Sequence, residues 1–223
     1  MPNNLRPTAK KRSTQSASIA PNLALKKQFD DMFLAEGQGW LAINKPCGIA
    51  VQGGTSVVTH IDGLLQGLAP QRSERLRLVH RIDKDTSGAL LLAKSLDSAR
   101  ALTKAFQSQL IEKTYLALIA GVTPKTGRIC APIKKLAGKL GEKMIVDEDG
   151  REAITMFQRI DNVGCKLSLV ALRPVTGRTH QLRLHMKHIK TPICGDKKYG
   201  GEEGDLQGVI SVSYTHLTLP TIE

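Results

Sequence analysis

The feature that most constrains this chain is a polar stretch beginning HRIDKDTS at His80, held between two short apolar runs. The runs, Leu76 to Val79 and Gly88 to Ala93, are too short for typical helices and have the composition of buried strands. A loop held at both ends by strands presents its side chains rigidly, as functional sites require. The pattern therefore predicts strand, loop and strand, with the polar side chains at a cleft.

Other segments repeat this mixture of short strands and amphipathic helices. We predict further strands over residues 40–45, 114–120, 153–160 and 167–172. One helix is expected after Ser56, and a second after Ser95, because serine is a good N-cap. Their predicted buried faces are Val57, Ile61, Leu64, Leu65 and Leu68 in the first, and Leu96, Ala99, Leu102, Phe106 and Leu110 in the second. Interleaved strands and helices predict an α+β fold, with residues 134–152 as a long loop or a hairpin.

The apolar content is ordinary for a soluble domain. Of 223 residues, 41% are hydrophobic, which is enough for one core. The chain has no run of 18 apolar residues, and its first residues lack the apolar segment of a secretory signal. We therefore expect a cytoplasmic protein that neither spans nor is anchored in a membrane.

The charge points to a polyanionic partner. Lys and Arg number 32 against 20 Asp and Glu, a net charge of +12, which suits nucleic acid or, as the alternative, an anionic membrane surface. Residues 1–29 contain six basic residues and no acidic one. We predict that they form a disordered basic arm, which either binds phosphates or is only solvated.

Asp83 has the most promising chemistry in the polar loop. A carboxylate kept ionised by a nearby guanidinium, here Arg81, can act as a nucleophile or a base. The alternative is an ion pair on a surface turn.

A second polar stretch, RPVTGRTHQLRLH at residues 173–185, turns from a predicted strand into a helix that begins near Thr179. The backbone N–H groups of that helix start, beside Arg178 and Arg183, are suited to a phosphate or a carboxylate.

The histidines and cysteines do not have metal-site spacing. His180, His185 and His188 are five and three residues apart, unlike the i, i+4 pair of a helical zinc site. The four cysteines are far apart and form no C-x-x-C pair, so we interpret them as buried free thiols. No metal is expected.

Five motifs, in order, resemble the RluA/RluC-type pseudouridine synthases. LVHRIDKDTSGALLLAKS is similar to the family's His-Arg-Leu-Asp signature, and INKPCGIAVQGG to its Asn-Lys-Pro loop. EKTYLALIAG, GREAITMFQ and RPVTGRTHQLRLHM, followed by GDKKYG, complete the series over residues 40–200. The resemblance implies the pseudouridine-synthase core, an α+β fold with a mainly antiparallel, bisected sheet.

The resemblance also implies roles for individual residues. Asp83 matches the essential aspartate, Tyr115 the tyrosine under the target base, and Arg183 the basic residue that pairs with the aspartate. RNA contacts are expected from residues beside these: Arg81, which would enter the base stack, His80, Lys45, Arg178 and Thr179. Tyr115 as ordinary core, His80 as a hydrogen-bonded loop residue and Lys45 as a structural lysine are the alternatives. The implied reaction uses no cofactor, and we expect a monomer.

The loop GEKMIVDEDGREAITMF most resembles the branch that modifies large-subunit ribosomal RNA. Transfer RNA as the substrate, or a catalytically silent RNA-binding or ribosome-assembly factor, are the alternatives. Members of this branch usually carry an N-terminal S4-like domain, for which the residues before Trp40 are too few and too polar. We therefore predict an arm over 1–29, a catalytic domain over 30–203 and an atypical, truncated or foreign tail over 204–223.

Overall fold

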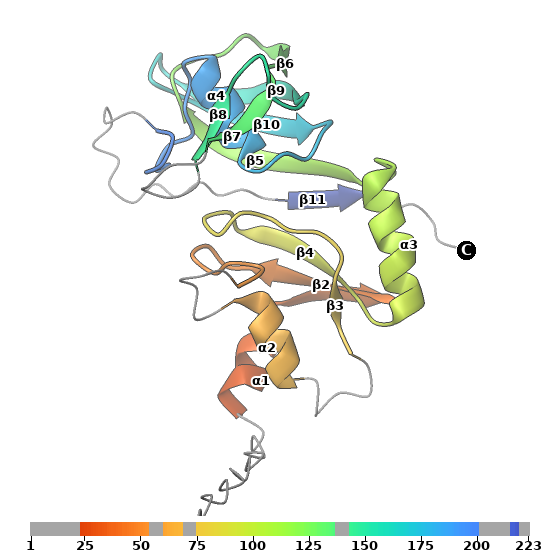
Figure 1. Cartoon of the computed structure of the whole chain (residues 1–223). Coiled ribbons are helices and arrows are strands. Elements are labelled where there is room, and N and C mark those ends of the chain that lie inside the picture. Colours follow the sequence, from red (N-terminus) through yellow and green to blue (C-terminus); the bar gives the residue numbers. More distant parts are fainter. Residues whose placement is uncertain (1–22, 54–59, 69–74, 137–142, 201–214, 219–223) are drawn as a thin grey trace, which may run out of the picture.

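The computed structural model describes residues 23–53, 60–68, 75–136, 143–200 and 215–218 (Figure 1). The helices are α1 (Leu23–Asp30), α2 (Ile61–Leu68), α3 (Leu96–Gln107) and α4 (Gln181–His188). The strands are β1 (Phe33–Gly37), β2 (Trp40–Lys45), β3 (Arg77–Leu78), β4 (Gly88–Ala93), β5 (Glu112–Ala120), β6 (Thr126–Cys130), β7 (Ile133–Leu136), β8 (Lys143–Val146), β9 (Ile154–Val163), β10 (Leu167–Pro174) and β11 (Thr215–Thr218).

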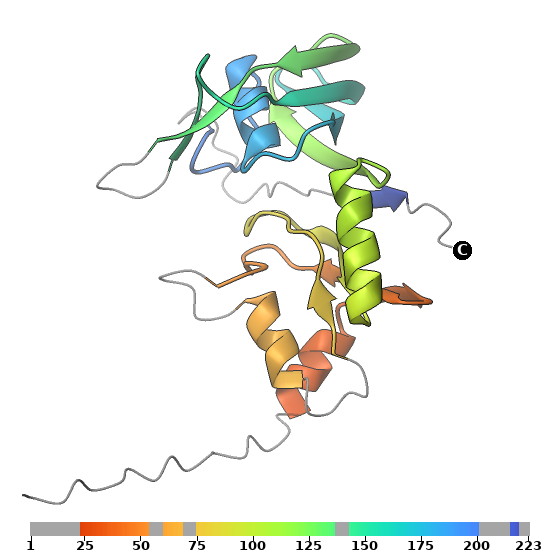
Figure 2. The same cartoon turned by 45° about the vertical axis from the view of Figure 1, so that its right-hand side comes forward.

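Nine of the strands form two sheets that lie one above the other in Figure 1, and β7 and β8 form a separate two-stranded sheet. The lower sheet has the order β1-β2-β4-β3, and the upper sheet the order β11-β5-β10-β9-β6. Neighbouring strands in both sheets are antiparallel. β11 lies between β5 and β4, and α3 runs along one end of both sheets in both views (Figures 1 and 2). The fold is therefore α+β with a mainly antiparallel, bisected sheet, as predicted.

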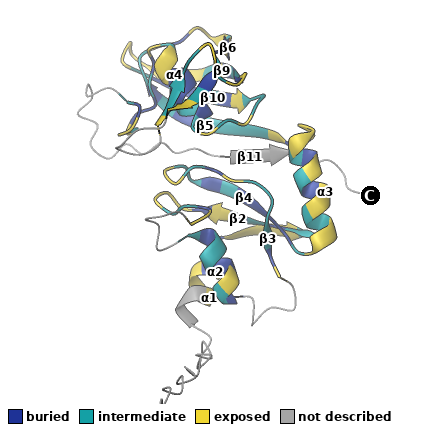
Figure 3. Ribbon diagram, viewed as in Figure 1, coloured by how far each residue is buried: buried dark blue, intermediate teal, exposed yellow. Residues whose placement is uncertain are grey.

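Each sheet has a core of its own, visible as the dark residues of Figure 3. α1 and α2 cover the lower sheet, and the predicted face of α2 is buried: Ile61, Leu64, Leu65 and Leu68. The upper core packs Met186 of α4 against β5, β9 and β10. Tyr115 of β5 packs against both cores, so one side chain joins the two halves of the molecule.

α3 begins as predicted, because Ser95 is its N-cap and forms a capping box with Ser98. Leu102 is buried against β4, but Leu96 and Leu110 are 50% and 62% exposed, so their predicted burial is wrong. Leu110 lies beyond the end of the helix at Gln107 and no longer follows the helical spacing. Leu96 is the first helical residue, one turn before the buried face begins.

One boundary differs from the prediction. The disordered arm was expected to reach residue 29, but α1 occupies residues 23–30 and Phe29 is only 2% exposed. This apolar anchor, with Met32 beside it in the core, holds the helix on the lower sheet. Residues 1–22 lie outside the described residues, as do Ser56 and Val57 and all of the predicted tail except β11, which pairs with β5.

The sequence pattern did not predict several smaller elements. β1 and β6 were not predicted, and residues 134–152 contain the hairpin of β7 and β8, one of the two alternatives.

Cys47, Cys130 and Cys165 are exposed and only Cys194 is buried, so the prediction of four buried thiols is wrong. Cys130, for example, occupies an outward position of β6. Among the described residues, no helix is long and apolar enough to cross a membrane.

Candidate active site

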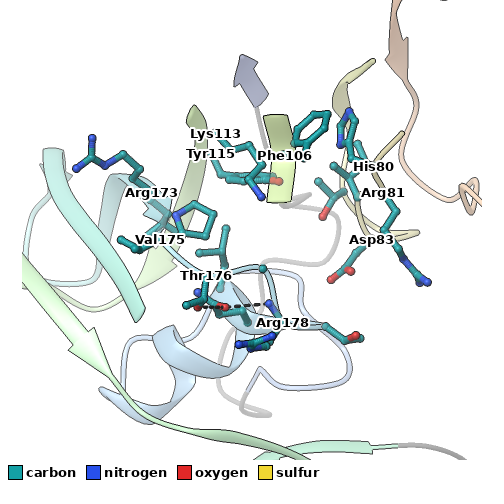
Figure 4. Close-up of a pocket in the computed structure, with 18 of the residues that line it drawn as sticks. His80, Arg81, Asp83, Phe106, Lys113, Tyr115, Arg173, Val175, Thr176 and Arg178 are labelled. Atoms are coloured by element: carbon teal, nitrogen blue, oxygen red, sulfur yellow. Dashed lines mark hydrogen bonds between the residues drawn. The ribbon is translucent and has the colours of Figure 1, made fainter. Parts of the chain in front are cut away.

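A cleft of about 720 Å³ lies between the two halves of the molecule. Its walls are the loop between β3 and β4 on one side and the turn from β10 to α4 on the other, with β5 and the end of α3 between them (Figure 4). The cleft brings together residues from both polar stretches, which are almost a hundred positions apart in the sequence.

Asp83 faces this cleft from the β3–β4 loop. Its side chain is 21% exposed, and its Oδ2 lies 3.5 Å from a terminal nitrogen of Arg183 and 4.0 Å from Nε2 of His180. The backbone carbonyl of Asp83 accepts the N–H of Thr86, which closes a turn below the carboxylate. The carboxylate is thus held at the surface of the cleft next to a permanent positive charge.

Lys45 supports the same loop from inside the protein. It is fully buried, and its ammonium donates to the carbonyls of Pro46, Ile49 and Lys84 at 2.8, 2.8 and 3.2 Å. Burial lowers its pKa to about 8, although the nearby charges of Cys47, Asp85 and Asp83 act in the opposite direction. The structural role that was the alternative for Lys45 is therefore present, because its donors hold the backbone beside Asp83, and an RNA contact stays a prediction.

Arg183 pairs with Asp83 as predicted, but its closest partner is Asp196. Nε and a terminal nitrogen of Arg183 both donate to Asp196 at 2.7 Å, and Asp85 lies 3.8 Å away. Burial would raise the pKa of Asp196, but the hydrogen bonds and charge of Arg183 outweigh it and lower this pKa. Asp196 therefore fixes the guanidinium, and Arg183 presents its remaining donor to Asp83.

Tyr115 lines the cleft from β5, next to Asp83. Burial raises the pKa of its hydroxyl, and the negative charge of Asp83 raises it further, so the ring is neutral. Lys113 lines the same wall two residues earlier, and its Nζ lies 5.9 Å from the ring centre of Phe106. Burial lowers the pKa of Lys113. This end of the cleft thus combines two aromatic rings with a partly desolvated amine (Figure 4).

His80 is built into the same end of the cleft. Its Nε2 accepts the N–H of Leu91 at 2.8 Å, and its ring packs 4.4 Å from that of Phe106. Burial and the charge of Lys113 lower its pKa to about 3, so the ring is neutral at physiological pH. The loop role that was the alternative for His80 is therefore present, and an RNA contact stays a prediction. Arg81, the next residue, is exposed and lines the cleft.

The turn into α4 is held by side chains. Gln181 accepts from the hydroxyl of Thr176 and from the N–H of Arg178, and it donates to the carbonyl of Ile154 and the hydroxyl of Thr155. α4 starts within two residues of the predicted position, and both Arg178 and Thr179 line the cleft. The Arg178 N–H, however, is used by Gln181 and is not available to a phosphate.

No three His, Cys, Asp or Glu residues come together as a possible metal site in the part of the chain that the structure describes. The absence of a metal from the reaction therefore stays a prediction.

Comparison with protein families identifies the family of this chain. Residues 39–188 match the family model described as RNA pseudouridylate synthase. The chain belongs to this family. The match includes both polar stretches and Asp83, Tyr115 and Arg183, so the resemblance of the five motifs is confirmed.

Curated relatives and solved structures of the family agree. The ribosomal large subunit pseudouridine synthase C of Rickettsia bellii is 41% identical over 180 residues, which cover 80% of this chain and 60% of the relative. That of Escherichia coli is 35% identical over 205 residues, covering 90% and 63%. This family member thus spans about 60% of the length of these relatives.

Two human structures share the fold. RNA pseudouridylate synthase domain containing 4 has a TM-score of 0.68 at 29% identity, over 80% of this chain and 72% of that one. RNA pseudouridylate synthase domain containing 1 has a TM-score of 0.70 at 26% identity, over 84% and 78%.

Sequence reasoning missed three residues that complete the site in this family member. Asp196 and Tyr199 belong to the GDKKYG motif, which carried the resemblance but was given no role. His180 was considered only as a metal ligand, although its ring lies beside Asp83. The only hint in the sequence was that these residues lie within or shortly after the RTHQLRLH stretch. Their contacts depend on how the segment after α4 folds back over that helix.

Proposed function

We propose that this chain converts uridine to pseudouridine in structured RNA, with large-subunit ribosomal RNA as the substrate. The observation that carries the proposal is Asp83 at the cleft surface, 3.5 Å from Arg183 and next to the ring of Tyr115. The choice of ribosomal RNA is supported by the relatives described above, which are ribosomal large subunit pseudouridine synthases.

The reaction breaks the C1′–N1 bond of a uridine and forms a C1′–C5 bond. The target nucleotide must leave its stack to reach a cleft, as in other enzymes that act on bases. Loss of the base builds positive charge on the ribose, as in glycoside hydrolysis, and the Asp83 carboxylate is placed to stabilise it. We leave open whether Asp83 attacks C1′, attacks C6 or removes a sugar proton.

The remaining steps need only groups of this cleft. Arg183 pairs with Asp83 and orients it, while the Tyr115 ring provides an apolar surface on which the detached uracil can rotate. When the C1′–C5 bond forms, the C5 proton of the uridine is released to solvent, and N1, which has lost its bond to C1′, takes up a proton. Because the product is an isomer of the substrate, the reaction needs no oxidant, reductant or group donor, which supports a mechanism without a cofactor.

RNA would bind along the basic rim of the cleft. Arg81, Arg178 and Thr179 line it, and the net charge of +12 favours a polyanion. Arg81 is suited to fill the gap left in the stack by the target base. A monomer suffices for this proposal because every residue named comes from one chain, and a ribosomal RNA substrate would place it in the cytoplasm.

The test is release of tritium from RNA labelled at uridine C5, with large-subunit ribosomal RNA, small-subunit ribosomal RNA and transfer RNA offered separately. We expect turnover on large-subunit ribosomal RNA. Turnover on transfer RNA alone would overturn the substrate, and tight RNA binding without release would indicate a silent binding factor.

Asp83→Asn is the matched variant, because it keeps the shape of the side chain and removes its charge. We expect it to bind RNA and fold as the wild type does, and to lose turnover by about a thousandfold or more, the scale of losing a reacting group. Retention of a tenth of the wild-type rate would reject Asp83 as the reacting carboxylate.

A further inference from the structure

His180 lies between Asp83 and a buried tyrosine. Its Nδ1 is 2.7 Å from the hydroxyl of Tyr199, and its Nε2 is 4.0 Å from Oδ2 of Asp83. The His180 side chain is 20% exposed, whereas Tyr199 is only 1% exposed. Nδ1 of the imidazole is thus bound to the protein interior, and Nε2 is directed to the carboxylate.

The contacts of Tyr199 determine which nitrogen of His180 carries the proton. The Tyr199 hydroxyl accepts the N–H of Met144 at 3.3 Å, and burial raises its pKa, so it keeps its own hydrogen. That hydrogen needs an acceptor because the hydroxyl is buried. Nδ1 of His180 is the acceptor within reach, which places the imidazole proton on Nε2, facing Asp83.

Burial lowers the pKa of His180 and favours this neutral form. Arg183 and Lys198 lower it further, while Asp83 and Asp196 act in the opposite direction.

The backbone of His180 supports a role in the site. The residue is the N-cap of α4, yet its side chain makes no capping hydrogen bond to the helix. Its φ of 53° is in the left-handed region, which only a few per cent of non-glycine residues adopt, although histidine adopts it more often than most. Such strain tends to persist at functional positions, where the surrounding structure maintains it. Here the helix gives up a cap and accepts strain to direct an imidazole into the cleft.

We propose that His180 is a positioning residue that orients Asp83 through its Nε2–H, alongside Arg183. This role rests on the proposed function. The present 4.0 Å is too long for a hydrogen bond. Catalytic hydrogen bonds are often long before the substrate binds, and RNA that fills the cleft would bring the loop of Asp83 and the start of α4 together.

Two amide variants separate this role from a structural one. In His180→Gln the amide nitrogen can occupy the place of Nε2 and donate to Asp83. In His180→Asn the amide lies at the place of Nδ1, so it can keep the Tyr199 contact but cannot reach Asp83. Asparagine also tolerates the left-handed backbone better than glutamine, so a purely structural role favours Asn.

The measurement is the single-turnover rate at saturating RNA, together with RNA affinity and thermal melting. We expect His180→Asn to lose about 10- to 100-fold in rate, the equivalent of one hydrogen bond to a charged group. His180→Gln should stay within about threefold of the wild type, a difference below 1 kcal/mol of activation free energy. RNA affinity should be unchanged in both.

Either of two results would overturn the proposal: a wild-type rate for His180→Asn, or a rate for His180→Gln no higher than that of His180→Asn. Asn above Gln would assign His180 to holding Tyr199. Wild-type protein without turnover would instead reject the proposed function, and the positioning role with it, so the two failures are distinguishable.

Discussion

The two walls of the cleft hold their functional groups in different ways. The wall of the β3–β4 loop is held through its backbone, because Lys45 and the N–H of Gly48 both bind the carbonyl of Lys84, next to Asp83. The Asp83 carboxylate itself makes its ion pair across the cleft, with Arg183, and Nε2 of His180 lies 4.0 Å away on the same wall as Arg183.

The opposite wall is held through its side chains. Arg183 is bound by both oxygens of Asp196, and Gln181 connects the turn before α4 to β9. His185 adds contacts from its two ring nitrogens to Thr155 and to the carbonyl of Ala131. Loss of a side chain here should therefore damage the fold as well as the site.

The difference shows that the reacting carboxylate and the groups that orient it are held in place by different kinds of contact. The carboxylate sits on a loop whose backbone is fixed but whose side chain has few neighbours, which leaves room for a nucleotide. The groups that orient it, Arg183 and His180, are already fixed by Asp196 and Tyr199 before the substrate arrives.

The largest effect on stability should come from Arg183→Met on the side-chain wall. Asp196 is 3% exposed and would lose the partner of its negative charge. Removing one member of a buried ion pair costs about 3–5 kcal/mol, so we expect a loss of this size in the free energy of unfolding.

Arg173→Met is the matched control, because the Arg173 ion pair with Glu112 is more than half exposed on both sides. Such a pair contributes about 0–1 kcal/mol. Urea denaturation of the two variants checks the contrast. Equal losses would show that Asp196 does not depend on Arg183.

Lys45→Met tests the backbone wall. The carbonyls of Pro46, Ile49 and Lys84 would each lose a donor, and among the described residues only that of Lys84 would keep a second one, the N–H of Gly48. We therefore expect a loss of about 2–4 kcal/mol in the free energy of unfolding, because the other two acceptors would lose the lysine without a replacement. Lys84→Met is the control: Lys84 is exposed, and its substitution should stay within about 0.5 kcal/mol of the wild type.

RNA binding by Lys45→Met separates the structural role from a phosphate contact. A lysine that neutralised a phosphate would change the slope of log affinity against log salt by about 0.7–0.9. We expect no change in this slope. A reduced slope with normal stability would support the RNA contact that the sequence suggested.

The sequence predicted those parts of the molecule that depend on local pattern. The buried face of α2, the cap at Ser95 and the strands around Asp83 follow from spacing and from short-range hydrogen bonds. The family motifs then placed Asp83, Tyr115 and Arg183 in one cleft, which periodicity alone did not do.

What the sequence did not predict depends on contacts between distant residues. Nothing local to Lys45 shows that the carbonyl of Lys84 lies 3.2 Å from its ammonium, 39 positions away. Arg183 and Asp196 are likewise 13 positions apart, and only the fold defines how the segment between them returns to the guanidinium. An edge strand such as β1, with four exposed residues in a row, also lacks the alternation that identifies a half-buried strand.

The smallest of these effects should be an acid sensitivity located at His80, on the backbone wall. Its pKa in the folded protein is about 3, against an ordinary value of 6.5. Below pH 6.5 the unfolded chain therefore binds a proton at this histidine that the folded protein does not bind, and unfolding becomes more favourable as the pH falls. The stability from a neutral His80 is complete above pH 6.5 and is lost progressively toward pH 3.

At pH 5 the loss of folding stability from this group alone is about 2 kcal/mol, at 1.36 kcal/mol for each pH unit below 6.5. Burial also lowers the pKa of His180 and His185, so they add to the same trend.

His80→Gln isolates the contribution of His80, because glutamine cannot be protonated and its side-chain carbonyl can accept the N–H of Leu91. We expect its free energy of unfolding to fall by about 2 kcal/mol less than that of the wild type between pH 7 and pH 5. Parallel curves for the wild type and His80→Gln would show that His80 can be protonated in place, and so that this end of the cleft is open to water.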